Sequence, residues 1–506
     1  MAAIFGNSGN HRNRLQKQIA KINMAMIYLK RKKSMLPVQE LNQRMKNISV
    51  NYFLIDVHKD KESYYAISEE ELFNPDNHLA LCGYILNLIM DGRLDEISGC
   101  LDRVPESLLI TKLGLRLIDP RVSWREFVKI IDKLKELNRP ITSVVLTVGR
   151  PSLMNGLNDF SRLGPLLKKY KALILEDLKY ICDEKIVLYI YNLLLAEYNY
   201  QQNNLVEAEM LVSSVIKAFD KHDERRLLFS ALYLQSKILL AQGKTVNADS
   251  YIEEINNRSK EKGKAEFSYN IDAVHVLFSL YEGNVKRITT WLKDSAPDEY
   301  KDFNMLDTYR YLIKIRCYMV TKNYAAAIAL AEKIRFLLTA GKRHLDLCEI
   351  DLLLAMNFFQ AGKKDFAFQA LERALKIARR RKLYRLIADE GEIMLQVLLA
   401  YGEEKNYSEL KSKETDFFMK IIEMTREMAI THPHYLKVYF PDNQKFSQME
   451  IDILKLLEMG KSKEEIGRYF FISLNTVKYH LKKIYTKLEA STSNQAVWNA
   501  RWIGLI

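Results

Sequence analysis

The residues with the clearest chemistry form a lysine-rich segment near the carboxyl end. Between positions 474 and 488 apolar residues recur at helical spacing, at Val477, Leu481, Ile484 and Leu488, and no acidic residue occurs. An α-helix fits the major groove of DNA, where lysine neutralises phosphates or reaches guanine, and asparagine pairs with adenine. A solvated charged face is the alternative. The candidate DNA-binding residues are Ser473, Asn475, Thr476, Lys478, Tyr479, Lys482, Lys483 and Lys487.

Four short helices must position this segment. A Ser or Thr followed three residues later by Glu or Gln predicts a helix start, and a glycine predicts a helix end. Gly460 ends the first helix, Phe471 and Ile472 make the turn before the lysine-rich helix, and Gly504 ends the last. The predicted caps are Ser447, Ser462, Ser473 and Thr492, with Glu450, Glu465 and Gln495 as the box partners. Two tightly joined helices in such a set predict a helix-turn-helix layout.

Many positions of this segment match one family at fixed spacing. The motifs are Phe446-Ser447-x-x-Glu450-x-x-Ile453-Leu454, Gly460-x-Ser462-x-x-Glu465-Ile466, Ile472-Ser473-x-x-Thr476-Val477-Lys478-x-His480, Ile484-Tyr485-x-Lys487-Leu488 and Gly504-Leu505. They resemble the LuxR-type DNA-binding domain, which implies a four-helix domain over 446–506. Met449, Glu489 and Ser493 stand where that family usually has Arg, Gly and Arg. We therefore expect a lower affinity for DNA than is typical.

The fourth helix of this domain is the candidate self-association face. In the resembled family this helix serves dimerisation, which assigns Val497, Trp498 and Trp502 to a dimer interface. Packing within the domain's own small core is the alternative. One such domain touches one half-site, so a homodimer on DNA is expected.

The middle of the chain carries an internal repeat. Turn-like pairs begin at Asn203, Gly243, Gly283, Lys322 and Gly362, at intervals of 39 or 40 residues. Five positions after each stands a small residue, except for Ile288. Hairpins at a fixed period stack into a solenoid, so we predict tetratricopeptide-like repeats over 185–431. Most aromatic side chains of the inner helices are expected in the core, and a few are expected to face the concave groove.

A second resemblance covers the centre. The residues Gly149-Arg150-Pro151-Ser152-x-x-x-Gly156-x-x-Asp159-Phe160, followed by repeats and a terminal LuxR-type domain, are similar to the MalT-like regulators. Those regulators place an ATPase before the repeats, which act as sensor. No phosphate-binding Gly-x-x-x-x-Gly-Lys-[Ser/Thr] motif occurs here. Gly243-Lys244-Thr245 matches the end of that motif, but Ile238 occupies the position of its first glycine. We expect no ATP switch and no cofactor.

The remaining segments are less distinctive. Residues 1–46 hold ten basic side chains and one acid, so 1–47 is predicted as a basic amphipathic helix that packs on the protein, binds a polyanion or lies on a membrane. Residues 48–184 are predicted to be mainly helical, with a small hairpin near 48–68. Residues 432–445 contain two prolines, Asp442 and Asn443, and are predicted as a linker. A metal at His432 and His434 lacks a visible third ligand.

Composition excludes several classes. Only 19 glycines and 10 prolines occur in 506 residues, which favours helix over a strand-rich fold. Five scattered cysteines without a Cys-x-x-Cys pair exclude a disulfide scaffold and a zinc ribbon. No apolar stretch is long enough for a membrane span or a signal peptide, so we expect a cytoplasmic protein with no membrane partner. Glu69, Glu70 and Glu71 indicate a solvated helix start, and no catalytic group or enzyme activity is predicted.

These patterns predict an all-α transcription regulator with a repeat solenoid and a terminal helix-turn-helix domain. The net charge of +13 suits double-stranded DNA as a partner. An unknown small molecule or protein would bind the repeats, and activation is favoured by resemblance. The alternative is an interaction scaffold whose helix-turn-helix docks on RNA polymerase.

Overall fold

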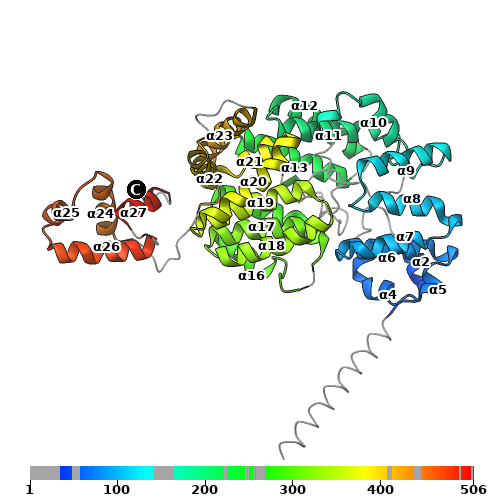
Figure 1. Cartoon of the computed structure of the whole chain (residues 1–506), viewed down its shortest axis with the longest axis horizontal. Coiled ribbons are helices and arrows are strands. Elements are labelled where there is room, and N and C mark those ends of the chain that lie inside the picture. The colour runs from blue at the N-terminus through cyan, green and yellow to red at the C-terminus, as the bar shows by residue number, and fades with distance from the viewer. Residues whose placement is uncertain are drawn as a thin grey trace, which may run out of the picture. The chain divides into compact units, whose positions relative to one another are not determined.

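The computed structural model (Figure 1) contains only helices in the ranges that it describes. This confirms the all-α prediction. The described ranges, apart from a few single positions within them, are 35–47, 57–141, 164–221, 225–257, 268–406, 413–437, 446–488 and 490–506. The basic segment before residue 35 and the Gly149–Asp159 motif lie outside them. In this part of the chain no helix is long and apolar enough to cross a membrane.

The hairpin expected near 48–68 is not present in the described part of this range, residues 57–68. Residues 48–56 lie outside the described ranges, and residues 57–66 are helical or in turns. Tyr64 is fully buried and Tyr65 half-buried on helix α4 (Lys61–Tyr65). The β-branched and aromatic composition therefore reflects burial here rather than a strand, because tertiary packing overrides strand propensity.

The first compact unit comprises most of residues 1–145. Helix α6 (His78–Met90) is its centre and has apolar residues on almost all sides, so neighbours α2 (Val38–Asn47), α4, α7 (Leu94–Asp102) and α8 (Leu109–Ile118) cover it. Asn42 ties α2 to α6 by accepting the Ala80 amide at 2.8 Å. Helix α5 (Glu69–Leu72), whose glutamates are exposed as predicted, and α9 (Trp124–Glu136) complete the unit with short turns at 75–77 and 106–108.

The repeat region consists of helical hairpins. The first helices of the hairpins are α11 (Val187–Gln201), α13 (Arg225–Ala241), α15 (Ser268–Glu282), α17 (Thr308–Val320) and α19 (His344–Gln360). The described second helices are α12 (Leu205–Lys221), α16 (Val285–Asp294), α18 (Tyr324–Ala340) and α20 (Lys364–Arg381). Helix α10 (Lys171–Leu178) and the turn 164–166 precede them, and 305–307 form a further turn.

The predicted repeat turns are confirmed in detail. Each turn's first residue has a positive φ, from 59° at Lys322 to 75° at Gly243. In each, the next amide donates to the carbonyl five residues earlier, as Lys244 N does to Leu239 O at 2.9 Å. The residue five positions after the turn is fully buried in every repeat, and Ile288 fills that site as completely as the alanines do. The close contact therefore requires an apolar side chain, although not always a small one.

After the last regular hairpin the chain turns back to the first. Lys382, at φ 56°, ends α20 and leads into the short helix α21 (Tyr384–Ala388), which is followed by α22 (Gly391–Glu404) and α23 (Lys413–Thr431). The Leu386 amide donates to Gln201 Oε1 at 3.1 Å, a contact 185 residues apart in sequence. Helix α21 thus lies against the inner helices of the repeats, among side chains from both ends of the array.

The carboxyl-terminal domain has its own core. Its helices are α24 (Gln448–Glu458), α25 (Lys463–Phe470), α26 (Leu474–Leu488) and α27 (Ser493–Trp502). The buried cluster joins Ile453 and Leu454 of α24, Ile466 of α25, the predicted stripe of α26 and Ala496 with Ala500 of α27. Because all four helices contribute, the domain buries an apolar centre without the repeats.

Candidate nucleic-acid interface and repeat pocket

The capping boxes predicted at Ser447 and Ser462 are present and fix the first two helices of the terminal domain. Ser447 Oγ accepts the Glu450 amide at 3.2 Å, and Glu450 Oε2 accepts the Ser447 amide at 2.8 Å. Ser462 and Glu465 repeat the arrangement at 3.2 and 2.8 Å. These bonds satisfy amides that a helix start otherwise leaves unpaired, so they define where α24 and α25 begin.

A tight turn sets the angle between α25 and α26. Phe471 adopts φ 56° and is almost fully exposed, while Gly467 packs so closely that a Cβ there would lie 3.0 Å from the Ile472 carbonyl oxygen. Ser473 Oγ then accepts the Thr476 amide at 3.1 Å and caps α26 as predicted. Ser473 and Thr476 therefore hold the amino end of the recognition helix, and their hydroxyls lie 2.8 Å apart.

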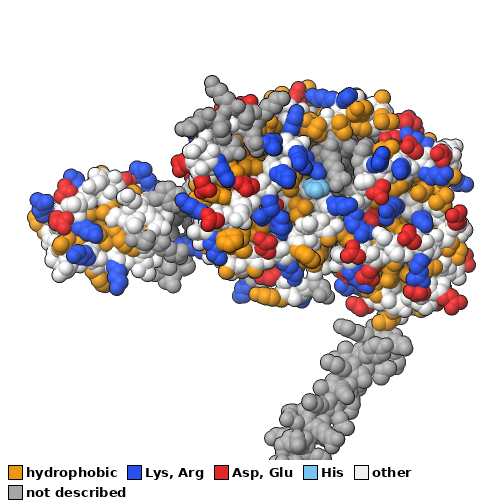
Figure 2. All heavy atoms as spheres, in the orientation of Figure 1, with side chains coloured by type: hydrophobic (Ala, Val, Ile, Leu, Met, Phe, Trp, Pro, Cys, Tyr) orange, Lys and Arg blue, Asp and Glu red, His pale blue; other side chains and the backbone are white. Residues whose placement is uncertain are grey.

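Helix α26 separates an apolar face from a basic one. Val477, Leu481, Ile484 and Leu488 are buried, as their spacing predicts. The exposed residues of the opposite face are Asn475, Lys478, Tyr479, Lys482 and Lys483. Lys483 Nζ lies 4.7 Å from the Tyr479 ring centroid, which keeps this ammonium beside an exposed aromatic ring. Figure 2 shows Lys and Arg side chains along the edge of the domain where α26 lies.

Lys487 lies apart from this basic face. Its Nζ is 2.5 Å from Glu450 Oε2, and the Glu450 side chain is only 3% exposed. Burial by itself raises the pKa of the Glu450 carboxyl, but the hydrogen bonds from Lys487 and from the Ser447 amide outweigh burial and lower the pKa. The structure thus places Lys487 in an ion pair inside the domain, where it joins α26 to the α24 capping box.

The tentative dimer face lies on α27. Ala496 and Ala500 are fully buried and define the side by which α27 packs on α24 and α26, while Val497 is half-buried. The side chains of Trp498 and Trp502 lie outside the described part of the structure. Asn499 Nδ2 donates to the Leu488 carbonyl at 2.7 Å and ties α27 to the end of α26.

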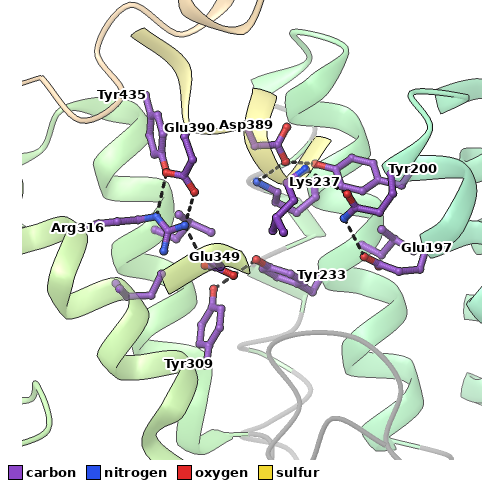
Figure 3. Close-up of a pocket in the computed structure, with 15 residues that line it drawn as sticks. Glu197, Tyr200, Tyr233, Lys237, Tyr309, Arg316, Glu349, Asp389, Glu390 and Tyr435 are labelled. Atoms are coloured by element: carbon purple, nitrogen blue, oxygen red, sulfur yellow. Dashed lines mark hydrogen bonds and ion pairs between the residues drawn. The ribbon is translucent and has the colours of Figure 1, made fainter. Parts of the chain in front are cut away.

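The inner helices of the repeats, together with α21 and Tyr435, line a small, partly open cavity of about 70 Å³. Figure 3 shows two groups of charged side chains facing each other across it, with Tyr233 and Tyr309 between them. Tyr200, Tyr233 and Tyr309 belong to the inner-helix aromatic residues, most of which were expected in the core, and these three line the cavity. The charged residues were missed, although a lysine inside the apolar run of α13 and an arginine inside α17 were visible signals.

The first group surrounds Asp389. Lys237 Nζ lies 3.1 Å and Arg385 Nη2 2.5 Å from the Asp389 carboxylate, and the Tyr200 hydroxyl donates to it. Burial raises the pKa of Asp389, but Arg385 and Lys237 outweigh burial, so the pKa lies below its ordinary value. Tyr281 accepts from Lys237 at 3.2 Å, and burial raises the pKa of Tyr281 to about 12. This group therefore holds two cations and one carboxylate.

The second group surrounds Arg316. Its guanidinium pairs with Glu349 at 2.8 Å and with Glu390 at closer range, and all three side chains are less than 10% exposed. The Tyr435 hydroxyl donates to Glu390 Oε2 at 3.2 Å. This group holds one cation and two carboxylates.

Residues 432–436 belong to the repeat region, so the prediction of a linker from residue 432 is wrong for this part. The Tyr435 ring stacks on Tyr281 with centroids 4.1 Å apart, and His432 Nε2 lies 2.8 Å from the Leu240 carbonyl oxygen. Leu436 is fully buried. The polar and proline-rich composition suggested a linker, but aromatic rings supply the contacts that hold the segment. The rest of the predicted linker, 438–445, lies outside the described ranges.

Stacked helical hairpins and a helix-turn-helix domain with a basic recognition helix define a class of multidomain DNA-binding proteins. Comparison with protein families specifies it further. Residues 183–404 match the MalT-like TPR region, and residues 444–500 match the bacterial regulatory proteins of the luxR family. The chain therefore carries a MalT-like TPR region followed by a LuxR-type domain, as its motifs predicted. It is a DNA-binding transcription regulator.

Proposed function

We propose that this regulator binds promoter DNA as a homodimer, responds to a signal received by its repeats and activates transcription. The observation that carries the DNA contact is the exposed face of α26, where Lys478, Lys482 and Lys483 stand on a helix without a single acid. In the proposed complex Asn475 and Tyr479, near the helix start, meet base edges, while the lysines contact phosphates or guanine. Ser473 and Thr476 orient that helix start, and Lys487 acts through domain stability.

A dimer is proposed because one helix-turn-helix domain reads only one half-site. The packed face of α27 is defined by Ala496 and Ala500. Helix positions 498 and 502 are each two residues further along, a rotation of about 200° from those alanines at 3.6 residues per turn. This register supports a self-association face on α27 over a place in the domain core.

The proposed signal path runs through residues 432–436. Tyr435 lines the repeat cavity and bonds to Glu390, and the terminal domain begins eleven residues later at Phe446. A ligand that binds one conformation of this segment more tightly than another shifts the equilibrium between the two conformations. The shift cannot exceed the difference between the ligand's affinities for them. The repeats would thereby control how the DNA-binding domains are held relative to each other on DNA.

The test compares the full chain with a fragment of residues 446–506 on one operator. Genome-wide mapping of bound DNA in the source cells would supply the operator, and footprinting at several salt concentrations would follow. We expect the full chain to give a sequence-specific, salt-stable footprint that changes when a cell extract is added. We expect the fragment to bind the same operator without responding to the extract. In vitro transcription would show increased output from the promoter. Weak, salt-labile binding alone would instead support a scaffold that docks on RNA polymerase.

A further inference from the structure

We propose that Phe471 is a further DNA-contacting residue, whose ring packs against the 5-methyl group of a thymine and makes the regulator prefer an A·T base pair at that position of the half-site. This inference rests on the proposed DNA interface of α26, and it adds a specificity-determining residue that lies outside that helix. The turn that holds Phe471 joins α25 to the amino end of α26 (Figure 1).

Phe471 occupies a backbone conformation that its side chain disfavours. Its φ of 56° and ψ of 37° lie in the left-handed region, where a Cβ crowds the backbone and glycine is the least costly residue. Among the described residues Leu436 also combines an apolar side chain with a positive φ, and its complete burial accounts for that conformation. The Phe471 side chain is 96% exposed, so packing within the domain does not offset the strain. A bulky residue held in this way indicates a role in binding rather than in folding.

The turn lies where the chain passes from the DNA backbone to the major groove. In a helix-turn-helix domain the recognition helix enters the groove by its amino end, while the preceding helix crosses the backbone. Phe471 stands two residues before Ser473, whose hydroxyl caps that amino end. An exposed side chain at this position is therefore within reach of the base pairs at the end of the half-site.

The surroundings of Phe471 suit a base edge better than a phosphate. No charged residue occurs between Tyr469 and Asn475, and Leu474, the first residue of α26, is exposed as well. Leu474 lies four residues before Lys478 and therefore on the same face of α26. Thymine presents an apolar methyl group in the major groove, and phenylalanine is among the side chains that contact it. The basic face of α26 is thus extended at its amino end by an apolar surface that fits this methyl group.

The first test uses the full chain and the operator found by genome-wide mapping. Each thymine of the half-site is replaced in turn by deoxyuridine, which removes the 5-methyl group and leaves the pairing with adenine unchanged. We expect replacement of at least one thymine to weaken binding about four-fold, the effect of burying one methyl-sized group. Native affinity after every replacement, or a half-site without thymine, overturns the proposal.

Variants identify the residue that contacts the methyl group. Phe471→Gly should bind the operator about ten-fold more weakly, and deoxyuridine at the sensitive position should then cause no further loss, because the two changes remove the same contact. Phe471→Leu keeps an apolar side chain and should retain most of the dependence on the methyl group. Phe336→Ala removes another exposed phenylalanine, on α18 of the repeats, and should bind like the native chain. An undiminished deoxyuridine effect in Phe471→Gly assigns the methyl contact to a different residue and overturns the proposal.

Thermal stability separates a binding role from a structural one. Phe471→Gly relieves the left-handed strain and loses almost no buried surface, so DNA affinity should fall without a decrease in the melting temperature of the terminal domain. Calorimetry of the full chain provides the measurement. A melting temperature that falls together with the affinity would give Phe471 a structural role and contradict the proposal.

The double variant Lys478→Ala and Lys482→Ala distinguishes failure of this inference from failure of the proposed function. If the double variant loses affinity while Phe471→Gly binds like the native chain, the DNA interface stands and the assignment of Phe471 is wrong. If both bind like the native chain, the interface itself is wrong. Native DNA affinity of Phe471→Gly together with reduced transcription in vitro would assign Phe471 to a protein partner and overturn the contact with thymine.

Discussion

Lys487 and Glu450 form an ion pair of 2.5 Å between the recognition helix and the first helix of the terminal domain. The same Glu450 oxygen accepts the Ser447 amide, so one carboxylate both caps α24 and binds α26. A lysine that sequence spacing groups with the DNA-binding residues is thereby used to hold the domain together. This relationship separates the two roles that basic residues play on α26, and it can be tested.

Replacement of Lys487 by Met should lower domain stability first and DNA affinity only as a consequence. The change leaves the Glu450 carboxylate buried with one partner fewer, which costs about 2 kcal/mol. Chemical unfolding of the 446–506 fragment would measure it. Lys455→Ala, at an exposed site on α24, is the control and should change stability by less than about 0.5 kcal/mol. An unaltered unfolding midpoint in Lys487→Met, with a large loss of DNA binding, would return Lys487 to the DNA-contacting set.

The double variant Lys478→Ala and Lys482→Ala should bind DNA much more weakly while the fold stays intact, because both side chains are exposed. A lost base contact costs about 1–3 kcal/mol and relaxes specificity at one position, whereas a lost phosphate contact weakens all sequences alike and reduces the salt slope by about 1. Titrations against cognate and scrambled DNA at several salt concentrations distinguish the two. The double variant Lys455→Ala and Lys463→Ala removes the same two charges at exposed sites outside α26 and is the charge-matched control. Wild-type affinity in the Lys478→Ala and Lys482→Ala variant would refute the proposed interface.

Trp498→Glu should reduce cooperativity on a paired operator more than it reduces binding to one half-site. The reason is that a charge on the proposed self-association face opposes dimerisation without touching the recognition helix. Asn494→Glu puts the same charge at an exposed position of the same helix and should have little effect. Mobility-shift titrations on one and two half-sites provide the measurement. Equal losses on both DNAs would place Trp498 in the domain core instead.

His432 predicts a pH dependence of the repeat region. Burial is the largest effect and lowers the pKa of His432, while the hydrogen bond to the Leu240 carbonyl raises it. The charges of Lys237 and Arg385 lower this pKa further, and the charge of Asp389 raises it. Since the folded-state pKa lies below the unfolded value of about 6.5, the unfolded chain takes up the proton first. Stability is therefore complete above about pH 6.5 and decreases as the pH falls toward the folded-state pKa.

Calorimetric melting at pH 7.5 and 5.5 would measure this effect in the full chain. His432→Gln keeps a hydrogen-bond donor for Leu240 and removes the titration, so the acid-induced decrease in melting temperature should shrink. A variant with the same decrease as the native chain would show that other groups cause the acid sensitivity.

Much of the secondary structure of this protein can be predicted from local sequence. Capping boxes, helical periodicity and positive-φ turns depend on residues within a few positions of each other, so Ser447, Ser462 and the repeat turns were all predictable. The recognition-helix stripe was predictable for the same reason, since Val477, Leu481 and Leu488 lie on one side of a single helix. The family motifs add positions whose spacing is fixed by that same local geometry.

Other features depend on contacts across long sequence separations, which only the tertiary structure decides. Nothing local distinguishes Lys487, which pairs with Glu450, from Lys483, which stays exposed. Residues 432–436 have a linker's composition, yet Tyr435 is buried because Tyr281, more than 150 residues earlier, offers its ring. The cavity likewise forms only when α21 returns to α11 and brings Asp389 to Lys237. Charge and periodicity determine which face of each helix is apolar and which is charged. The packing of α21 against the first repeat determines which of these charges form ion pairs.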